Sequence, residues 1–287
     1  MNNPLGINLW NWVNGLGPEC LGLAVRARDM GFTAVELPMT RPDADEALIK
    51  EIASLDMEVS LCAALGPGRD LSSFDGDIRR STMEYMTSCL DTARRTGAAV
   101  FAGPLYTGGG KRHRLTAEDQ KREWDLAVTG LRELSRRAGT CGVQLALEPL
   151  NRYRTSVINT ADQVLRLVED IGETNVGVHF DTFHAGIEED DLIGALRSVL
   201  EARKLVHFHA CSNNRGAPGQ GFFPWDTIWK LLWEYGYDGH ITMETFAPGG
   251  LDSGWIQLGG GPDQVALTGI QFMKKACSAL GLIPTRH

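Results

Sequence analysis

Two hydrophobic periods alternate along the chain. Short apolar runs, typical of buried strands, are followed by longer segments in which apolar positions recur every three or four residues, as on one face of a helix. The predicted strands cover residues 5–10, 33–37, 57–65, 98–102, 143–148, 175–181, 204–209 and 239–244. The predicted helices cover residues 18–30, 43–55, 75–96, 116–139, 160–171, 190–202, 224–235 and 262–280.

Residues with helix-terminating and helix-capping chemistry stand at several of these boundaries. Gly31 and Gly97 follow two predicted helices, and Asp43 and Thr116 stand where two others should begin. Eight strand-then-helix units in 287 residues, without a linker, predict a parallel sheet closed into one (β/α)8 TIM barrel domain spanning residues 1–287. A doubly wound open sheet is the alternative, but its first strand–helix turn would lack the glycine fingerprint of dinucleotide-binding folds.

Composition narrows the class of protein. The net charge of −8 argues against a nucleic-acid binder, whose affinity rests on cationic contacts to phosphates. No apolar stretch reaches the length of a membrane-spanning helix, and residues 1–6 do not resemble an export signal. The six cysteines are scattered without paired spacing, as expected of reduced thiols. We therefore expect a cytoplasmic protein that binds neither nucleic acid nor membrane.

Four potential metal ligands stand at the ends of consecutive predicted strands. Glu148, Asp181, His209 and Glu244 close strands five to eight, and strand ends of one barrel meet at its C-terminal face, where active sites lie. Three carboxylates crowded together repel one another unless a cation neutralises them. Oxygen ligands with one imidazole suit Mn²⁺, Mg²⁺ or Co²⁺. Helix caps and solvated surface groups are the alternative explanation for each residue taken singly.

Other polar residues surround this cluster. The two-residue period of a strand places His207 on the side of His209 and His179 on the side of Asp181, as groups that orient ligands or as core histidines. His184 and Arg215 fall on the loops beyond the strands. The basic run at 111–114 follows three glycines and is interpreted as an anion-binding segment, a lid over the mouth of the site or a solvated flexible loop, with the loop favoured.

Several sequence blocks together resemble one family. They are Leu147-Glu148-Pro149-Leu150-Asn151-Arg152-Tyr153, Asp181-Thr182-Phe183-His184, His207-Phe208-His209 with Asn214-Arg215, Pro224-Trp225-Asp226 and Met243-Glu244. They are similar to the signature blocks of ketose 3-epimerases, the tagatose and allulose 3-epimerases among the xylose-isomerase-like barrels. The resemblance is strongest over residues 98–247 and looser before them.

The resemblance implies a metal-dependent isomerase with a small sugar substrate. Glu148, Asp181, His209 and Glu244 would hold one divalent ion, most simply Mn²⁺, with Mg²⁺ or Co²⁺ as alternatives. Glu148 and Glu244 would also be catalytic: one removes the proton beside the carbonyl and the other returns one to the opposite face, through a metal-stabilised enediolate. The family habit further implies a homodimer or homotetramer.

Substrate-binding residues follow by position from the same resemblance. His184 and Arg215 match residues that contact substrate oxygens, and Trp12 and Cys62 fall where the family lines its pocket. One position departs from the family: a glutamate of the 3-epimerases is replaced by Arg154. Reversal of charge beside the substrate predicts a changed ligand, such as an anionic sugar derivative, a larger glycoside or a 3-keto sugar.

The alternatives differ in the fate of the deprotonated intermediate or in function altogether. A lyase would expel an aglycone from a 3-keto glycoside, as in the C-glycoside deglycosidases that resemble this superfamily. Apurinic endonucleases share the superfamily, but they carry more metal ligands and basic loops. A non-catalytic sugar-binding barrel would bind its ligand without turnover. We expect an epimerase or isomerase acting on a ketose or keto-sugar derivative.

Overall fold

Eight parallel strands form a closed barrel in chain order in this computed structural model, which describes residues 3–40, 46–66, 68–249 and 258–280. The strands are β1 (Leu5–Asn8), β2 (Ala34–Pro38), β3 (Glu58–Cys62), β4 (Val100–Gly103), β5 (Gln144–Leu147), β6 (Val176–Asp181), β7 (Leu205–Ala210) and β8 (Ile241–Met243). β8 pairs with β1 and closes the sheet, as the alternating pattern predicts. The predicted (β/α)8 barrel is confirmed.

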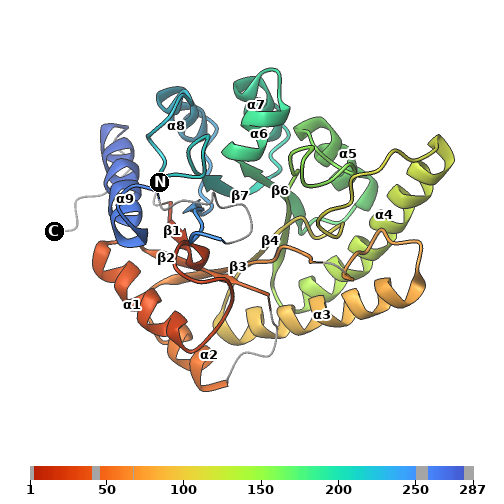
Figure 1. Cartoon of the computed structure of the whole chain (residues 1–287), viewed down its shortest axis with the longest axis horizontal. Helices are drawn as coiled ribbons and strands as arrows, with labels where there is room; N and C mark the ends of the chain where they lie inside the picture. The colour runs from red at the N-terminus through yellow and green to blue at the C-terminus, as the bar shows by residue number, and fades with distance from the viewer. Residues whose placement is uncertain (1–2, 41–45, 67, 250–257, 281–287) are drawn as a thin grey trace.

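Helices surround the strands in a ring that follows chain order (Figure 1). They are α1 (Glu19–Met30), α2 (Glu46–Ala53), α3 (Gly76–Thr96), α4 (Ala117–Thr140), α5 (Ala161–Ile171), α6 (Thr182–Glu188), α7 (Leu192–Glu201), α8 (Trp225–Glu234) and α9 (Pro262–Ala279), with a short 3₁₀ helix η1 (Leu9–Asn11) after β1. Among the described residues, no helix combines the length and apolar character that crossing a membrane requires.

Most helix boundaries match the expected signals. Gly31 and Gly97 adopt left-handed conformations after α1 and α3, and the Thr116 side chain accepts a hydrogen bond from the backbone of the first turn of α4. The predicted cap Asp43 lies outside the described residues. One expectation is wrong: the chain after β6 forms the helix α6 instead of a loop, because the Asp181 side chain caps it.

The apolar core lies between the barrel and the ring of helices, whereas part of the barrel interior is polar. Among the fully buried polar side chains are Asn8, Glu36, Ser60, His207 and Thr242, one from each of five strands. Barrel interiors are filled by layers of inward-facing side chains, usually branched and apolar. Polar groups in that position need partners, and these partners build the site described next.

An irregularity in the pairing of β6 with β7 sets the register of the site. The pairing shifts between Val178 and His179, which brings His179 opposite His207 and Asp181 opposite His209. Bulges add local twist and redirect side chains, and they are frequent beside active sites. Here the shift aligns a carboxylate and an imidazole from neighbouring strands at the same level of the barrel.

Candidate active site

Glu148, Asp181, His209 and Glu244 converge at the C-terminal end of the barrel, as expected from their positions at strand ends. One potential ligand atom from each residue lies within 4.8 Å of those of the other three, and all four side chains are buried. The His209 Nδ1 atom lies 3.3 Å from the Glu244 Oε1 atom and 3.9 Å from the Asp181 Oδ2 atom. Four residues far apart in the sequence therefore form one buried cluster.

Asp181 has two structural roles, and both follow from its place at the junction of β6 and α6. Its Oδ1 atom accepts hydrogen bonds from the backbone N–H groups of Phe183 at 2.6 Å and His184 at 3.3 Å. These bonds satisfy donors at the start of α6 that have no partner within the helix. The second oxygen, Oδ2, faces the cluster and its neighbour Arg215.

Glu36, which was not predicted from the sequence, contacts the nitrogen of His209 that does not face the cluster. The fully buried Glu36 carboxylate lies 2.7 Å from the His209 Nε2 atom through its Oε1 atom and accepts hydrogen bonds from Asn8 at 2.7 Å and Ser60 at 3.0 Å. A carboxylate on one imidazole nitrogen fixes the ring and directs the other nitrogen. The available signal was an inward-facing acid within the apolar strand β2.

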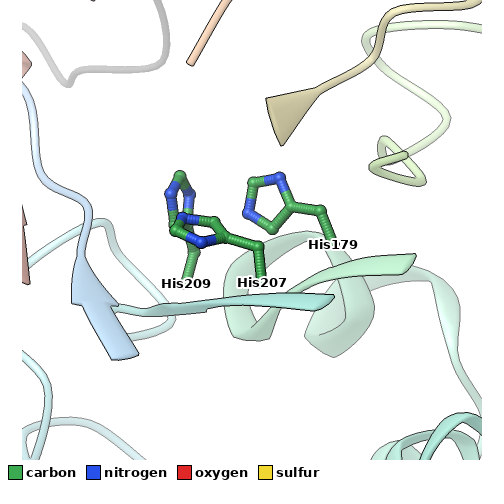
Figure 2. A group of neighbouring side chains, drawn as sticks. All are labelled: His179, His207 and His209. Atoms are coloured by element: carbon green, nitrogen blue, oxygen red, sulfur yellow. The ribbon is translucent and has the colours of Figure 1, made fainter. Parts of the chain in front are cut away.

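Three imidazoles stand together on the same side of β6 and β7 (Figure 2). The ring centroids of His179 and His207 lie 4.0 and 5.0 Å, respectively, from that of His209, so the predicted side of each strand is correct. The His207 Nε2 atom lies 2.7 Å from the Glu36 Oε2 atom, which places His207 in the network that orients His209. The His179 Nδ1 atom lies 3.7 Å from the Glu148 Oε2 atom.

Arg215 supplies a buried positive charge to the cluster. Its Nη1 atom lies 2.5 Å from the Asp181 Oδ2 atom and 2.8 Å from the Glu244 Oε2 atom. Its guanidinium also stacks over the Phe183 ring, 4.2 Å from the centroid. Arg215 adopts a left-handed backbone conformation, φ 61°, which is uncommon for a residue other than glycine and concentrates at functional sites.

His184 is held as a neutral imidazole beside Arg215. Burial, followed by the charge of Arg215, lowers the pKa of His184 to about 3. The His184 Nδ1 atom accepts a hydrogen bond from the Asn151 backbone N–H at 3.1 Å, and the Nε2 atom lies 3.8 Å from the Glu148 Oε1 atom. The ring is therefore fixed in place and faces one of the cluster carboxylates.

Crowding shifts the pKa values of the cluster in opposite directions. Burial raises the pKa of Glu148 well above its ordinary value, and the charges of Glu244 and Asp181 raise it further. Burial also works against ionisation of Glu244, but His209 and Arg215 outweigh it and lower the pKa of Glu244. Burial disfavours a charged His209, yet Glu244, followed by Glu36, raises its pKa well above the ordinary value.

A cavity opens above these groups, and most of the predicted substrate-binding residues line it. Cys62, Arg154, His184 and Arg215 line the cavity together with Glu148 and Glu244. Burial and the surrounding carboxylates raise the pKa of the Cys62 thiol well above its ordinary value, so the sulfur is not a thiolate. Cys62 therefore lines this cavity as an uncharged thiol.

Trp12 is the exception among the predicted lining residues. It follows η1, and its indole N–H donates a hydrogen bond to the Asp263 carboxylate of α9 at 2.7 Å, away from the lining. Trp10 lines the cavity instead and stacks on Phe246 with centroids 5.5 Å apart. The turn of η1 after β1 decides which tryptophan faces inward, and this turn was not predicted.

The basic run at 111–114 divides between a buried anchor and an exposed surface. The Lys111 Nζ atom lies 2.8 Å from the Asp70 Oδ2 atom and 2.7 Å from the Glu123 Oε1 atom, and its side chain is only 14% exposed. The residues at 112–114 are exposed. The preferred interpretation as a solvated loop holds for these three residues and is wrong for Lys111, which joins the loops after β3 and β4.

The convergent cluster is a candidate metal site. Three carboxylates and one imidazole nitrogen are ligands that divalent cations accept, and a dication would offset the mutual repulsion of Glu148, Asp181 and Glu244. The hydrogen bonds of Glu36 to His209 and of the backbone to Asp181 supply the outer contacts that orient ligands at such sites. The donor set therefore fits a divalent ion.

Comparison with known proteins identifies one matching family and several similar epimerases. The model of the family described as "Xylose isomerase-like TIM barrel" matches residues 24–276. A D-psicose 3-epimerase of Ruminiclostridium cellulolyticum is 34% identical over 216 residues, 73% of each chain, and a ketose 3-epimerase of Arthrobacter globiformis is 30% identical over 239 residues, 82% of this chain and 81% of that one.

Structural comparison extends the similarity over the whole chain. A solved structure of L-ribulose 3-epimerase superposes with a TM-score of 0.88 at 28% identity, covering 100% of this chain and 99% of the other. The family model and this structural similarity agree with the closed barrel. The chain belongs to the xylose isomerase-like TIM barrel family.

Proposed function

We propose that this protein is a divalent-metal-dependent sugar epimerase, an isomerase that inverts the carbon next to the carbonyl of a ketose or keto-sugar derivative. The observation that carries the proposal is the buried convergence of Glu148 and Glu244 with Asp181 and His209 at the C-terminal end of the barrel. Relatives of this chain include a D-psicose 3-epimerase, a ketose 3-epimerase and an L-ribulose 3-epimerase, which supports the same reaction type here.

In this proposal the metal is held by Glu148, Asp181, His209 and Glu244. A bound divalent cation would supply Lewis-acid polarisation of the substrate carbonyl, which makes the adjacent C–H group more acidic. Mn²⁺ is the proposed ion, with Mg²⁺ and Co²⁺ as alternatives. The test of its identity is to strip the protein of metal and reload it with each ion separately before measuring turnover.

Glu148 and Glu244 are the proposed proton carriers. One carboxylate accepts the proton from the carbon beside the carbonyl, and the other carboxylic acid donates a proton to the opposite face, so the carbon is inverted and both groups exchange protonation states. Arg215 and His184 line the same cavity and are proposed to contact substrate oxygens. Burial of the cluster keeps competing water away from the deprotonated intermediate.

Turnover in D₂O tests the reaction type. We expect metal-loaded protein incubated with D-fructose, D-psicose or L-ribulose to give an epimeric product carrying deuterium at the inverted carbon. Glu148→Gln and Glu244→Gln should each lower kcat by about 10²–10⁴-fold, since each removes a proton carrier. Far-UV circular dichroism of the variants serves as the folding control.

Two outcomes would contradict the proposal. Unchanged turnover in both variants would show that the two carboxylates do not transfer the protons. Release of an aglycone from a 3-keto glycoside, without deuterated epimer, would indicate elimination in place of epimerisation.

We also propose an oligomeric state and a cellular location for the protein. The exposed aromatic residues Trp233 and Tyr235, at the end of α8, support a homodimer or homotetramer, which light scattering on the purified protein would test. The six cysteines are free thiols, which supports residence in the reducing cytoplasm. Fractionation of cells that express the full chain tests this location.

A further inference from the structure

A second group of potential metal ligands meets the far edge of the His209 ring. Glu36, Cys62 and His209 each offer one atom within 4.8 Å of those of the other two, and all three side chains are buried. The His209 Nε2 atom lies 2.7 Å from the Glu36 Oε1 atom, whereas the Nδ1 atom lies 3.3 Å from the Glu244 Oε1 atom. The candidate metal site and this second group therefore share one imidazole.

The spacing of the second group suits one small ion. In a tetrahedral zinc site, bonds of about 2.0–2.3 Å hold the ligand atoms roughly 3.3–3.8 Å apart. The 2.7 Å contact between Glu36 and His209 lies below that range, and the 4.8 Å limit of the group lies above it. Small shifts of the side chains therefore bring the three ligand atoms to the required separation.

The donor atoms distinguish the second group from the candidate metal site. A thiolate sulfur, an imidazole nitrogen and a single carboxylate oxygen are ligands of Zn²⁺, whereas Mn²⁺ and Mg²⁺ favour sites richer in oxygen. The candidate metal site is such a site, with three carboxylates and one imidazole. Zn²⁺ with the Glu36 carboxylate, the Cys62 thiolate and a neutral His209 also forms an uncharged unit, which suits a buried position.

The surroundings fix the carboxylate and leave the sulfur open to the cavity. Glu36 accepts hydrogen bonds from Asn8 at 2.7 Å and Ser60 at 3.0 Å, and its Oε2 atom lies 2.7 Å from the His207 Nε2 atom. Contacts of this kind orient the ligands of metal sites. Cys62 is a free thiol that lines the cavity, so an ion that enters the cavity can reach the sulfur.

We propose that Glu36, Cys62 and His209 form a second, zinc-selective metal site, and that an ion bound there excludes an ion from the candidate metal site. On binding, the Cys62 S–H bond breaks, the sulfur electron pair forms the bond to Zn²⁺, and the proton passes to solvent. The His209 Nε2 lone pair forms a second bond. A neutral imidazole with its lone pair at Nε2 carries its proton at Nδ1, so His209 serves only one of the two ions. The exclusion, but not the zinc site itself, rests on the metal site of the proposed function.

Co²⁺ reports on the second site, because its absorption spectrum depends on the donor atoms that bind it. The metal-stripped full chain is titrated with Co²⁺, and so is the double variant Glu148→Gln/Glu244→Gln, which lacks two ligands of the candidate metal site. We expect the double variant to give a thiolate-to-cobalt charge-transfer band in the near ultraviolet. One equivalent of Zn²⁺ should remove this band, whereas one equivalent of Mn²⁺ should not.

Matched cysteine variants identify the sulfur. Cys62→Ser, added to the double variant, should abolish the band and weaken Zn²⁺ binding by on the order of 100-fold, since one ligand is lost. Cys141→Ser removes a half-buried thiol at the end of α4 and should keep the band. In the otherwise unchanged protein, Cys62→Ser should leave the dissociation constant for Mn²⁺ within about threefold. Thermal unfolding of each variant controls for folding.

The outcomes separate the zinc site from the proposed function. Absence of the band from the double variant, or a band that survives Cys62→Ser, would overturn the zinc site. Simultaneous binding of one Zn²⁺ and one Mn²⁺ to the unchanged protein, measured by metal analysis after gel filtration, would overturn the exclusion. Failure of the unchanged protein to bind Mn²⁺, with the Cys62-dependent band retained, would refute the metal site of the proposed function and leave the zinc site standing.

Discussion

At the scale of single residues, Glu36 links the interior of the barrel to the candidate metal site. Its carboxylate meets His209, His207, Asn8 and Ser60, which come from three other strands. Burial opposes ionisation of this group, but His209, followed by His207, lowers the pKa of Glu36 well below its ordinary value. Glu36 therefore stays an anion that can hold the His209 ring and direct its Nδ1 atom at the cluster.

Replacement of Glu36 tests this positioning role. Glu36→Gln keeps the volume but weakens the contact with His209 Nε2, and we expect the dissociation constant for Mn²⁺ to rise by about 10–100-fold. Calorimetric titration of metal into the stripped protein measures the change. Glu58→Gln is the matched control, since its carboxylate also meets a histidine, His240 at 2.9 Å, but does so away from the cluster. Equal metal affinities in both variants would contradict the role of Glu36.

At the scale of elements, the connections after β3, β4 and β5 are tied together by one lysine. Lys111 pairs with Asp70 after β3 and with Glu123 on α4, and its carbonyl receives the N–H of Ser156 after β5. All three ionic side chains are largely buried, so removal of the cation would leave two carboxylates without their counter-charge. The connections that form the wall of the cavity thus depend on this residue.

Removal of the lysine should be costly in stability. Lys111→Ala leaves the buried Asp70 and Glu123 carboxylates with less compensation, and we expect the free energy of unfolding to fall by about 3 kcal/mol. Urea denaturation followed by circular dichroism measures this change. The exposed neighbour supplies the control, because Arg112→Ala should stay within about 0.5 kcal/mol of the unchanged protein. Equal stability of the two variants would show that the Lys111 pairs contribute nothing.

At the scale of the whole molecule, the candidate metal site joins strands that are distant in sequence. Glu148, Asp181, His209 and Glu244 follow or end four neighbouring strands, and their carboxylates repel one another inside a buried space. A ligand that binds only the assembled cluster stabilises the folded state by mass action. Metal binding and barrel stability should therefore be coupled.

Metal removal measures this coupling directly. With free Mn²⁺ at about 100 times its dissociation constant, the native state should gain about 2.7 kcal/mol. For a chain of this size that corresponds to a rise in Tm of roughly 5–10 °C over protein treated with a chelator, followed by differential scanning calorimetry. The double variant Glu148→Gln/Glu244→Gln should show no such rise. A Tm that is the same with added metal and with chelator would contradict the proposed site.

The sequence by itself determined the barrel and the main cluster of polar residues. The physical reason is that both follow from the short repeat of apolar positions in strands and helices. Alternating apolar segments specify strands and helices, and a parallel barrel brings every strand end to one face, so Glu148, Asp181, His209 and Glu244 had to meet. The same logic could have found Glu36, because an inward-facing acid in the middle of an apolar strand needs a partner inside the barrel.

Tertiary structure decided the features that depend on local turns and distant partners. The turn η1 brings Trp10 into the cavity in place of Trp12, and no hydrophobic period encodes that turn. The helix α6 forms where a loop was expected, because the Asp181 carboxylate caps it. The ion pairs of Lys111 and the position of Arg154 in the cavity wall join segments whose distance in space the sequence does not state.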